Sequence, residues 1–276
     1  MTLGIYMRPS MQPTTRRHAR PLFDCWRAVE ARIRRAERVL LLLDFDGTLV
    51  GFKRNPEEVK LDAATRRLLA NLARHPRVTL GFVSGRRRAD LKRRIGVRNA
   101  CYYGLHGWES HPGMRLDGAS RKLLAAARGE LAAKVEGEPG VWLEDKQASF
   151  VLHYRESPPR AALRAQAASR AVVRRFAPCI RSLSGKKIVE LLPAGLPGKG
   201  EAVASVVNGR GRGALAIYAG DDTTDESAFA VLKRGITIRV GSYAKTQARY
   251  RVRDPRELIL FLDRLADLLS RFPDSP

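Results

Sequence analysis

Five consecutive apolar residues, Val39 to Leu43, lead directly into the segment Asp44-Phe-Asp-Gly-Thr-Leu49. A short, continuous apolar run that ends in polar turn residues predicts a strand buried on both faces, as at the centre of a parallel sheet. Two carboxylates beside such a strand need a compensating cation or ligand, because a buried unpaired charge is strongly unfavourable. An acidic turn without function is the alternative, since Asp-Gly is a common turn dipeptide. The segment therefore predicts a fold built on a sheet and marks the first candidate site.

Similar apolar segments recur along the chain and alternate with helical patterns. The predicted strands cover residues 78–83, 100–105, 214–219 and 236–240, and the predicted helices cover 22–38, 61–74, 199–207, 226–233 and 257–272. Regular alternation of buried strands and helices predicts an α/β fold, a doubly wound parallel sheet with helices on both faces. Ligands bind such sheets at the carboxyl ends of the strands, where we expect the functional site.

The pattern changes between residues 110 and 195. A helix over 120–135 precedes strands 141–143 and 149–154, and a helix that opens at Pro158-Pro159 precedes strands 180–183 and 187–191. This α-β-β-α-β-β order predicts a small separate sheet. We therefore expect an inserted α/β domain at 110–195, within a core domain of residues 21–109 and 196–276. Residues 1–20 hold four arginines and no acid, which predicts a disordered basic arm, with an organellar transit peptide as the weaker alternative.

Composition excludes some classes of protein. No apolar run approaches the roughly 18 residues that a membrane-spanning helix needs, so we expect no membrane contact. The three cysteines are odd in number and widely spaced, which favours a reducing compartment and a cytoplasmic location. The 51 Lys and Arg against 28 Asp and Glu give a net charge of +23, which attracts anions of many kinds. A nucleic-acid-binding module is the weaker interpretation, because the basic residues form no dense block. A monomer is favoured, with the oligomeric state left open.

Polar and charged groups also follow other predicted strands. One strand ends at Ser84-Gly85-Arg86 and another at Gly220-Asp-Asp-Thr-Thr-Asp225. Gly198-Lys199-Gly200 opens a helix, which places an ammonium group beside a positive helix N-terminus. Each segment alone is typical of a plain turn. Together at one sheet edge they predict carboxylates for a hard cation and cations for a phosphoryl group.

A closer resemblance rests on six segments: Asp44 to Leu49, Ser84-Gly-Arg86, Gly104-Leu-His-Gly107, Leu143-Glu-Asp-Lys146, His153-Tyr-Arg155 and Gly220-Asp-Asp-Thr-Thr-Asp-Glu226. With these the chain resembles the haloacid dehalogenase-type phosphatases, and among them the trehalose-6-phosphate phosphatase family, from about Val39 to Leu268. The resemblance implies a haloacid dehalogenase (HAD)-like core, an inserted cap domain, and hydrolysis of trehalose 6-phosphate to trehalose and phosphate. The family usually has Glu-Ile-Arg-Pro where this chain reads Glu190-Leu-Leu192-Pro. A phosphatase that acts on another sugar phosphate, such as glucosylglycerol phosphate or mannosylglycerate phosphate, therefore remains the alternative.

The resemblance also implies catalytic roles. Asp44 would be the nucleophile that forms an aspartyl-phosphate, and Asp46 would be the acid/base partner. Mg²⁺ would lie between the Asp44 carboxylate, the backbone carbonyl of Asp46 and Asp221.

Other residues would hold the substrate. Ser84 and Lys199 would grip the phosphoryl oxygens, while Asp222 and Asp225 would orient water or fix Lys199, with direct metal ligation as the alternative. Further substrate contacts are predicted for Gly85, Arg86, His106, Glu109, Lys146, His153 and Glu190. For the residues of the inserted domain, ordinary surface charge is the alternative, and for His106 it is a structural turn.

Overall fold

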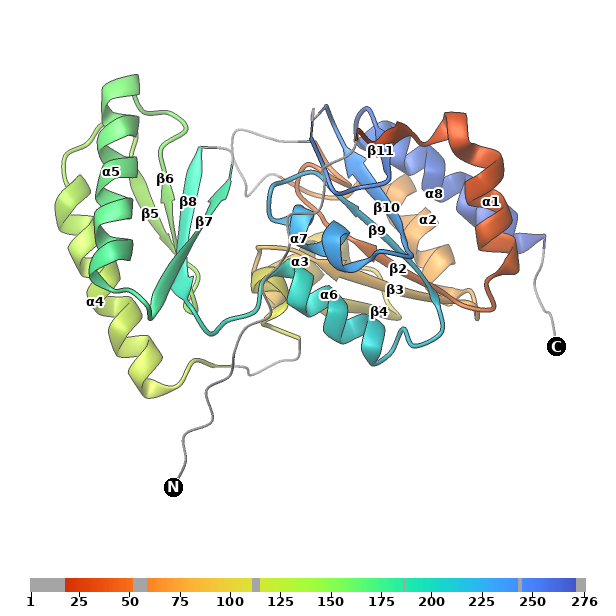
Figure 1. Cartoon of the computed structure of the whole chain (residues 1–276), viewed down its shortest axis with the longest axis horizontal. Coiled ribbons are helices and arrows are strands. Elements are labelled where there is room, and N and C mark those ends of the chain that lie inside the picture. Colours follow the sequence, from red (N-terminus) through yellow and green to blue (C-terminus); the bar gives the residue numbers. More distant parts are fainter. Residues whose placement is uncertain (1–17, 52–58, 111–114, 186, 243–244, 272–276) are drawn as a thin grey trace.

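A computed structural model describes residues 18–51, 59–110, 115–185, 187–242 and 245–271 (Figure 1). It contains a seven-stranded sheet with helices on both faces and a four-stranded sheet with helices on one face. We call the larger sheet and its helices the core, and the smaller sheet and its helices the cap. The described part of the chain has no helix that is long and apolar enough to cross a membrane.

All neighbouring strands of the core sheet are parallel, in the order β1-β11-β10-β9-β2-β3-β4. The strands are β1 (Arg20–Pro21), β2 (Val39–Leu43), β3 (Val78–Val83), β4 (Ala100–Tyr103), β9 (Leu215–Gly220), β10 (Ile236–Val240) and β11 (Tyr250–Val252). The chain leaves β2 toward β3 and β4, and later returns to its other side through β9. Such a reversal of strand order opens a crevice at the carboxyl ends of the two strands beside it. Asp44 and Asp221, which follow β2 and β9, both lie at this crevice.

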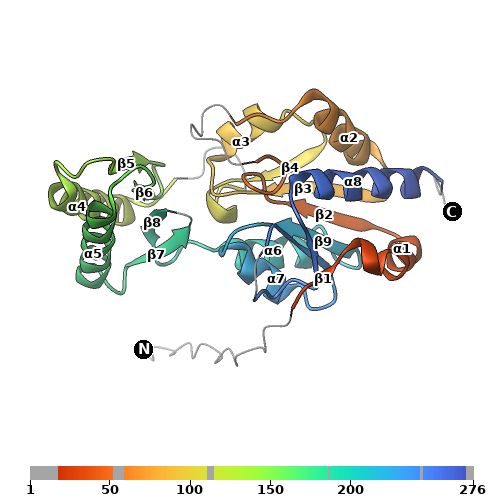
Figure 2. The same cartoon turned by 90° about the horizontal axis from the view of Figure 1, so that it is seen from above.

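Helices cover both faces of the core sheet (Figure 2). They are η1 (Phe23–Cys25), α1 (Trp26–Arg35), α2 (Ala63–Arg74), α3 (Arg88–Ile95), η3 (Leu105–Gly107), α6 (Lys199–Asn208), α7 (Asp225–Val231) and α8 (Pro255–Ser270). Leu41 and Leu43 pack in one apolar cluster with α1, α2 and α8, whereas Leu40 and Leu42 pack in another with α6 and α7. Because side chains alternate along a strand, both faces of β2 are buried, and this explains its continuous apolar sequence.

The cap is inserted between η3 and α6. It consists of α4 (Gly118–Val135), β5 (Trp142–Asp145), β6 (Phe150–His153), α5 (Pro159–Arg175), β7 (Ile180–Gly185) and β8 (Ile188–Pro193). Its strands are antiparallel in the order β5-β6-β8-β7. Phe150, Leu152 and Leu191 pack beneath α4 and α5, which lie on the side of the sheet away from the core (Figure 1). The opposite face of this sheet is turned toward the core. We propose residues 110 and 195 as the domain boundaries.

The predicted α/β fold with a doubly wound parallel sheet is confirmed, and the differences lie in short elements. Helix α3 and the edge strands β1 and β11 were not predicted. Arg20, assigned to the disordered arm, instead pairs with Tyr250 in the sheet, while residues 1–17 of that arm lie outside the described residues, as does the predicted helix end at 272. The strand predicted to reach residue 105 ends at Tyr103, because the backbone turns into η3.

Candidate active site

Three carboxylates and one ammonium group meet in the crevice between β2 and β9. One carboxylate oxygen from each of Asp44, Asp221 and Asp225 lies within 4.8 Å of the others. Lys199, the first residue of α6, donates from Nζ to Oδ1 of Asp44 and to Oδ1 of Asp225, each at 2.8 Å. All four side chains are buried. The structure therefore brings together residues that the sequence places at three separate strand or helix ends.

The three carboxylates outnumber the single ammonium group, so this cluster carries an excess of negative charge. Burial raises the pKa of Asp44 well above its usual range; Lys199 opposes the shift, and Asp225 and Asp221 add to it. Burial would lower the pKa of Lys199, but Asp225 and Asp44 outweigh it, so the pKa of the ammonium group is raised. Lys199 thus stays charged, and three buried carboxylates share one cation. This imbalance favours a further cation at the site.

The loop after β2 is shaped by the same carboxylates. Thr48 donates from Oγ1 to Oδ2 of Asp44 at 3.0 Å, with Oδ1 of Asp221 at 3.3 Å. Gly47 has a φ of +81°, and a Cβ at this position would overlap the Asp221 carboxylate. A side chain is therefore excluded twice, by conformation and by space. The Asp-Gly-Thr sequence is explained by how closely this turn approaches β9.

Asp46 faces a different partner. Arg86 donates from Nε to Oδ2 of Asp46 at 2.7 Å and from Nη2 to Oδ1 at 2.8 Å. Its Nη1 donates to Asp90 in α3 at 3.0 Å. Burial would lower the pKa of Arg86, but its bonds to Asp46 and Asp90 raise it. We predicted Arg86 as a substrate contact; the structure places its guanidinium group on the predicted acid/base residue.

Asp225 is held from three directions. In addition to Lys199, the hydroxyl of Tyr218 donates to its Oδ1 at 2.6 Å, and the backbone N–H of Asp222 donates to its Oδ2 at 2.8 Å. Tyr218 was not among the predicted residues, because a tyrosine inside an apolar strand is indistinguishable from a core residue. Ser84 is buried at the end of β3, where its Oγ accepts from the backbone N–H of Arg86 at 3.2 Å. The contacts of Asp225 therefore position Lys199, and the contact of Ser84 holds the loop that follows β3.

A second buried cluster joins the cap to the core. Glu190 of β8 accepts a hydrogen bond from Ser149 at 2.5 Å, and its Oε2 lies 2.9 Å from His106 Nε2 and 3.5 Å from Lys146 Nζ. Lys146 also donates to the backbone carbonyl of Gly85 at 3.0 Å. Burial would raise the pKa of Glu190, but Lys146 and His106 lower it, so the carboxylate stays ionised. Two of these contacts, from His106 and from Lys146, cross between core and cap.

The turn that carries His106 requires an unusual backbone. His106 has φ 60° and ψ 21°, in the left-handed region, and its backbone N–H donates to the carbonyl of Ser84 at 2.9 Å. A Cβ on Gly85 would come within 2.9 Å of the imidazole Cε1. Gly85 is therefore needed for the close approach of the His106 ring. This geometry brings both predicted substrate contacts to the cap–core boundary.

His153 lies on the same open face of the cap sheet. Its Nε2 is 2.9 Å from Oε2 of Glu144, and its ring stacks on Trp142 with centroids 3.8 Å apart. Strand pairing sets Trp142 opposite His153, and sets Glu144 and Glu190 on either side of Val151, so these side chains share one face. Glu144 was placed in a loop by the sequence analysis, whereas β5 continues to Asp145. Glu144 and Lys146 are two positions apart, and side chains at this spacing along a strand point to the same face of a sheet. That spacing was the signal in the sequence.

Two further positions differ from their expected surroundings. The carboxylate of Glu109 accepts from the backbone N–H of Arg88 at 2.6 Å and lies 3.5 Å from Arg87, away from the Glu190 cluster. Leu192, at the position where the sequence resemblance implies an arginine, is buried and paired across the sheet with Arg181 of β7. Directly paired residues lie on the same face of a sheet. An arginine is thus present one strand away from its expected position.

Solved structures with the same arrangement define the class. The trehalose-6-phosphate phosphatase C-terminal domain of C. albicans matches with a TM-score of 0.78 and 22% identity, covering 92% of this chain and 99% of that chain. A haloacid dehalogenase-like hydrolase from Bacteroides thetaiotaomicron matches with a TM-score of 0.60 and 15% identity, covering 83% and 99%. The fold is that of the HAD-like hydrolases, as predicted.

The particular family follows from sequence. The family model described as trehalose-phosphatase matches residues 42–256. The trehalose-phosphate phosphatase of Mycobacterium avium (strain 104) is 33% identical over 250 residues, covering 84% of this chain. This chain spans 63% of the length of that relative. The chain belongs to the trehalose-phosphatase family.

Proposed function

We propose that the chain hydrolyses trehalose 6-phosphate to trehalose and phosphate through an aspartyl-phosphate intermediate. The observation that carries the proposal is the contact of Lys199 with Asp44 at the sheet crevice, opposite a cap face that presents Glu144, Lys146, His153 and Glu190. The crevice offers a nucleophile beside a cation, and the cap face offers donors and acceptors for hydroxyl groups. Membership of the trehalose-phosphatase family supports the same substrate.

In the first step, a carboxylate oxygen of Asp44 attacks phosphorus as the bond to the sugar oxygen breaks. Lys199 lies on Oδ1 of Asp44, where it can also bind phosphoryl oxygens, with Ser84 as the second donor. Asp46 gives a proton to the departing sugar oxygen. Because Arg86 donates to both oxygens of Asp46, protonation of that carboxylate requires one of these two contacts to break.

In the second step, water attacks the phosphorus of the aspartyl-phosphate, Asp46 takes a proton from that water, and phosphate leaves with Asp44 restored. Splitting the hydrolysis in this way replaces one difficult displacement by two easier ones. Asp225 contacts Lys199 and not the reacting atoms in this scheme, because Lys199, Tyr218 and the Asp222 backbone N–H already occupy its oxygens.

The residues fit Mg²⁺. The side-chain atoms that could ligate a metal here are carboxylate oxygens, which suit a hard cation, and the excess of buried negative charge favours binding of one. Asp44, Asp221 and the backbone carbonyl of Asp46 would hold it. When bound, it supplies positive charge that offsets repulsion between the anionic nucleophile and an anionic phosphate ester. EDTA is expected to abolish phosphate release and Mg²⁺ to restore it; full activity after exhaustive chelation would contradict the proposal.

We also propose a cytoplasmic location, since Cys25, Cys101 and Cys179 are all free thiols, as in a reducing compartment.

The function is tested by phosphate release from a panel of sugar phosphates in the presence of Mg²⁺. The panel contains trehalose 6-phosphate, glucose 6-phosphate, sucrose 6-phosphate, and the phosphates of glucosylglycerol and mannosylglycerate. We expect kcat/KM for trehalose 6-phosphate to exceed the others by about tenfold or more, as separate hydroxyl contacts each add discrimination. Preference for a glycerol- or glycerate-linked sugar would assign that substrate instead, and equal rates on all five would contradict a sugar-reading cap.

A further inference from the structure

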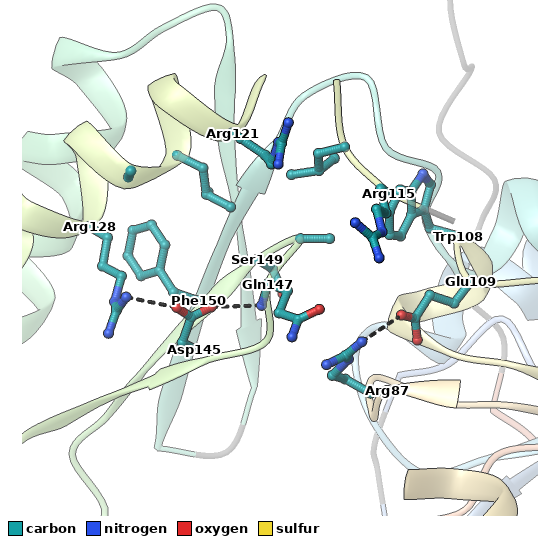
Figure 3. Close-up of a pocket in the computed structure, with 14 residues that line it drawn as sticks. Arg87, Trp108, Glu109, Arg115, Arg121, Arg128, Asp145, Gln147, Ser149 and Phe150 are labelled. Carbon is teal, nitrogen blue, oxygen red and sulfur yellow. Dashed lines mark hydrogen bonds and ion pairs between the residues drawn. The ribbon is translucent and has the colours of Figure 1, made fainter. Parts of the chain in front are cut away.

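A cavity of about 680 Å³ lies between the cap and the core, outside the proposed active site (Figure 3). It is lined by the β5–β6 hairpin, by α4, and by the core loops that carry Arg87 and Glu109. Asp145 and Gln147 line it, whereas Glu144 and Lys146, which alternate with them along the chain, belong to the active-site face. We call it the hinge cavity, because Glu109 of the core and Arg115 of the cap both line it.

Positive charge dominates the hinge cavity. Its lining contains four arginines, Arg87, Arg115, Arg121 and Arg128, against two acids, Glu109 and Asp145. Both acids are already engaged. Glu109 accepts from the backbone N–H of Arg88 at 2.6 Å, and Asp145 accepts from Arg128 and from the backbone N–H of Gln147, each at 2.7 Å. Glu109 also lies 3.5 Å from Arg87, so the two carboxylates of the lining pair with Arg87 and Arg128, and neither pairs with Arg115 or Arg121.

Donor groups remain available to a ligand. Neither Arg115 nor Arg121 has a carboxylate partner among the described residues, and both belong to the cavity lining drawn in Figure 3. The Nε of Arg87 is buried and has no hydrogen-bond partner in the described part of the chain. Arg115 and Arg121 are solvent-exposed. Guanidinium groups bind phosphate through paired, charge-assisted N–H donors. Trp108 and Leu124 add apolar surface beside these donors.

We propose that the hinge cavity binds a phosphorylated small molecule as a second ligand of this protein. Arg115 and Arg121 hold its phosphate, with Arg87 approaching from the core, and Trp108 contacts its uncharged part. The volume suits a ligand of metabolite size. Such a ligand touches core and cap at once. Ser149, which lines the cavity, also donates to Glu190, so the second ligand lies one hydrogen bond away from the cluster that joins cap and core.

The test is equilibrium binding by calorimetry to the full chain in EDTA, where the acidic crevice lacks a metal ion and repels phosphate. The probes are ATP, glucose 6-phosphate and inorganic phosphate, which distinguish a nucleotide, a sugar phosphate and the free anion as the source of the phosphate. We expect at least one probe to bind with a dissociation constant of about 1 mM or tighter. The double variant Arg115→Ala/Arg121→Ala should weaken that binding by about tenfold or more, since charge-assisted bonds are lost.

Two control variants make the result decisive. Lys122→Ala removes one positive charge from α4, next to Arg121, at an exposed position outside the cavity lining, and should change binding by less than about twofold. Ser84→Ala alters the proposed phosphoryl site and should leave binding in the hinge cavity unchanged. The proposal is overturned if no probe binds, if the double variant behaves like Lys122→Ala, or if Ser84→Ala abolishes binding while the double variant retains it.

Discussion

The core crevice and the cap face each bury a cluster of charges, but the two clusters are built differently. In the crevice, Asp44 and Asp225 contact Lys199, Asp221 lies close to both carboxylates, and every member belongs to the core. On the cap face one carboxylate, Glu190, is surrounded by Lys146 and His106, which come from cap and core respectively. The crevice is therefore complete without the cap, whereas the contacts of His106 with Glu190 and of Lys146 with Gly85 exist only while the cap lies on the core.

This difference separates two tasks. The crevice has an excess of negative charge, which suits a cation and, through it, a phosphate of any alcohol. The cap face has near-balanced charge and many hydrogen-bonding groups, which suits the hydroxyls of a sugar. Changes in the crevice should therefore impair all phosphate esters, and changes on the cap face should impair sugar phosphates selectively.

The largest expected effect comes from Asp44→Asn. The amide has the same shape but cannot form an aspartyl-phosphate, so phosphate release should fall below about a hundredth of wild type for both trehalose 6-phosphate and para-nitrophenyl phosphate. Rates are measured by phosphate release and by nitrophenolate absorbance, with the unfolding transition as a check on the fold. Residual turnover above that level on either ester would show that Asp44 is not the nucleophile.

Lys199→Ala comes next. It removes the ammonium group that lies on Asp44, and both esters should lose about two orders of magnitude or more in kcat/KM. Circular dichroism is needed alongside, because the variant leaves Asp44, Asp221 and Asp225 without their cation. A folded variant that lost activity on trehalose 6-phosphate alone would show that Lys199 contacts the sugar and not the phosphate.

Arg181→Ala tests whether an arginine on β7 compensates for Leu192 on β8. If the guanidinium group contacts the sugar, kcat/KM for trehalose 6-phosphate should fall by about tenfold while para-nitrophenyl phosphate hydrolysis stays within about twofold. Arg160→Ala, which removes an exposed arginine at the start of α5, is the matched control. If both arginine variants behave alike on both esters, Arg181 is structural, and its bond to the carbonyl of Leu196 is its main role.

The smallest effect concerns stability. Burial would raise the pKa of Asp90, but Arg94, Arg93 and Arg86 lower it from 3.8 to about 2. A lowered folded-state pKa stabilises the protein above the unfolded value of 3.8, and that contribution is lost as the pH falls toward about 2. Asp90→Asn should therefore lower the Tm by a few degrees at most at neutral pH, since the group is partly exposed, and by less below pH 3.8. Thermal unfolding against pH, with the exposed Asp263→Asn as control, measures this; an unchanged difference across the range would contradict it.

Much of the core was predictable from sequence because its signals are local. The apolar run Val39 to Leu43 is followed directly by aspartates, and a parallel sheet brings the carboxyl ends of its strands together. Strand β11 was missed because Tyr250-Arg-Val252 is too short and mixed to stand out, and β1 depends on pairing with it. Half of the residues of helix α3 are basic, and its ion pairs through Asp90 stabilise it in ways that periodicity does not reveal.

The pairing of site residues was harder to predict than their identity. Arg86 and Asp46 are 40 residues apart, and His106 and Glu190 are 84 apart, so only the tertiary fold sets these contacts. The hinge cavity likewise arises from segments that meet only when the cap lies on the core. Local sequence therefore indicated the candidate groups of the site, while their partners required the three-dimensional arrangement.

The most direct test of the division between core and cap is the ratio of kcat/KM for trehalose 6-phosphate to that for para-nitrophenyl phosphate in Lys146→Ala and Glu190→Gln. The small ester lacks a sugar, so we predict that this ratio falls by about tenfold or more in both variants, with the para-nitrophenyl phosphate rate within about threefold of wild type. Lys134→Ala, on α4 of the cap, should leave the ratio unchanged. Equal losses on both esters would contradict the division and show that the Glu190 cluster is needed for phosphoryl transfer itself.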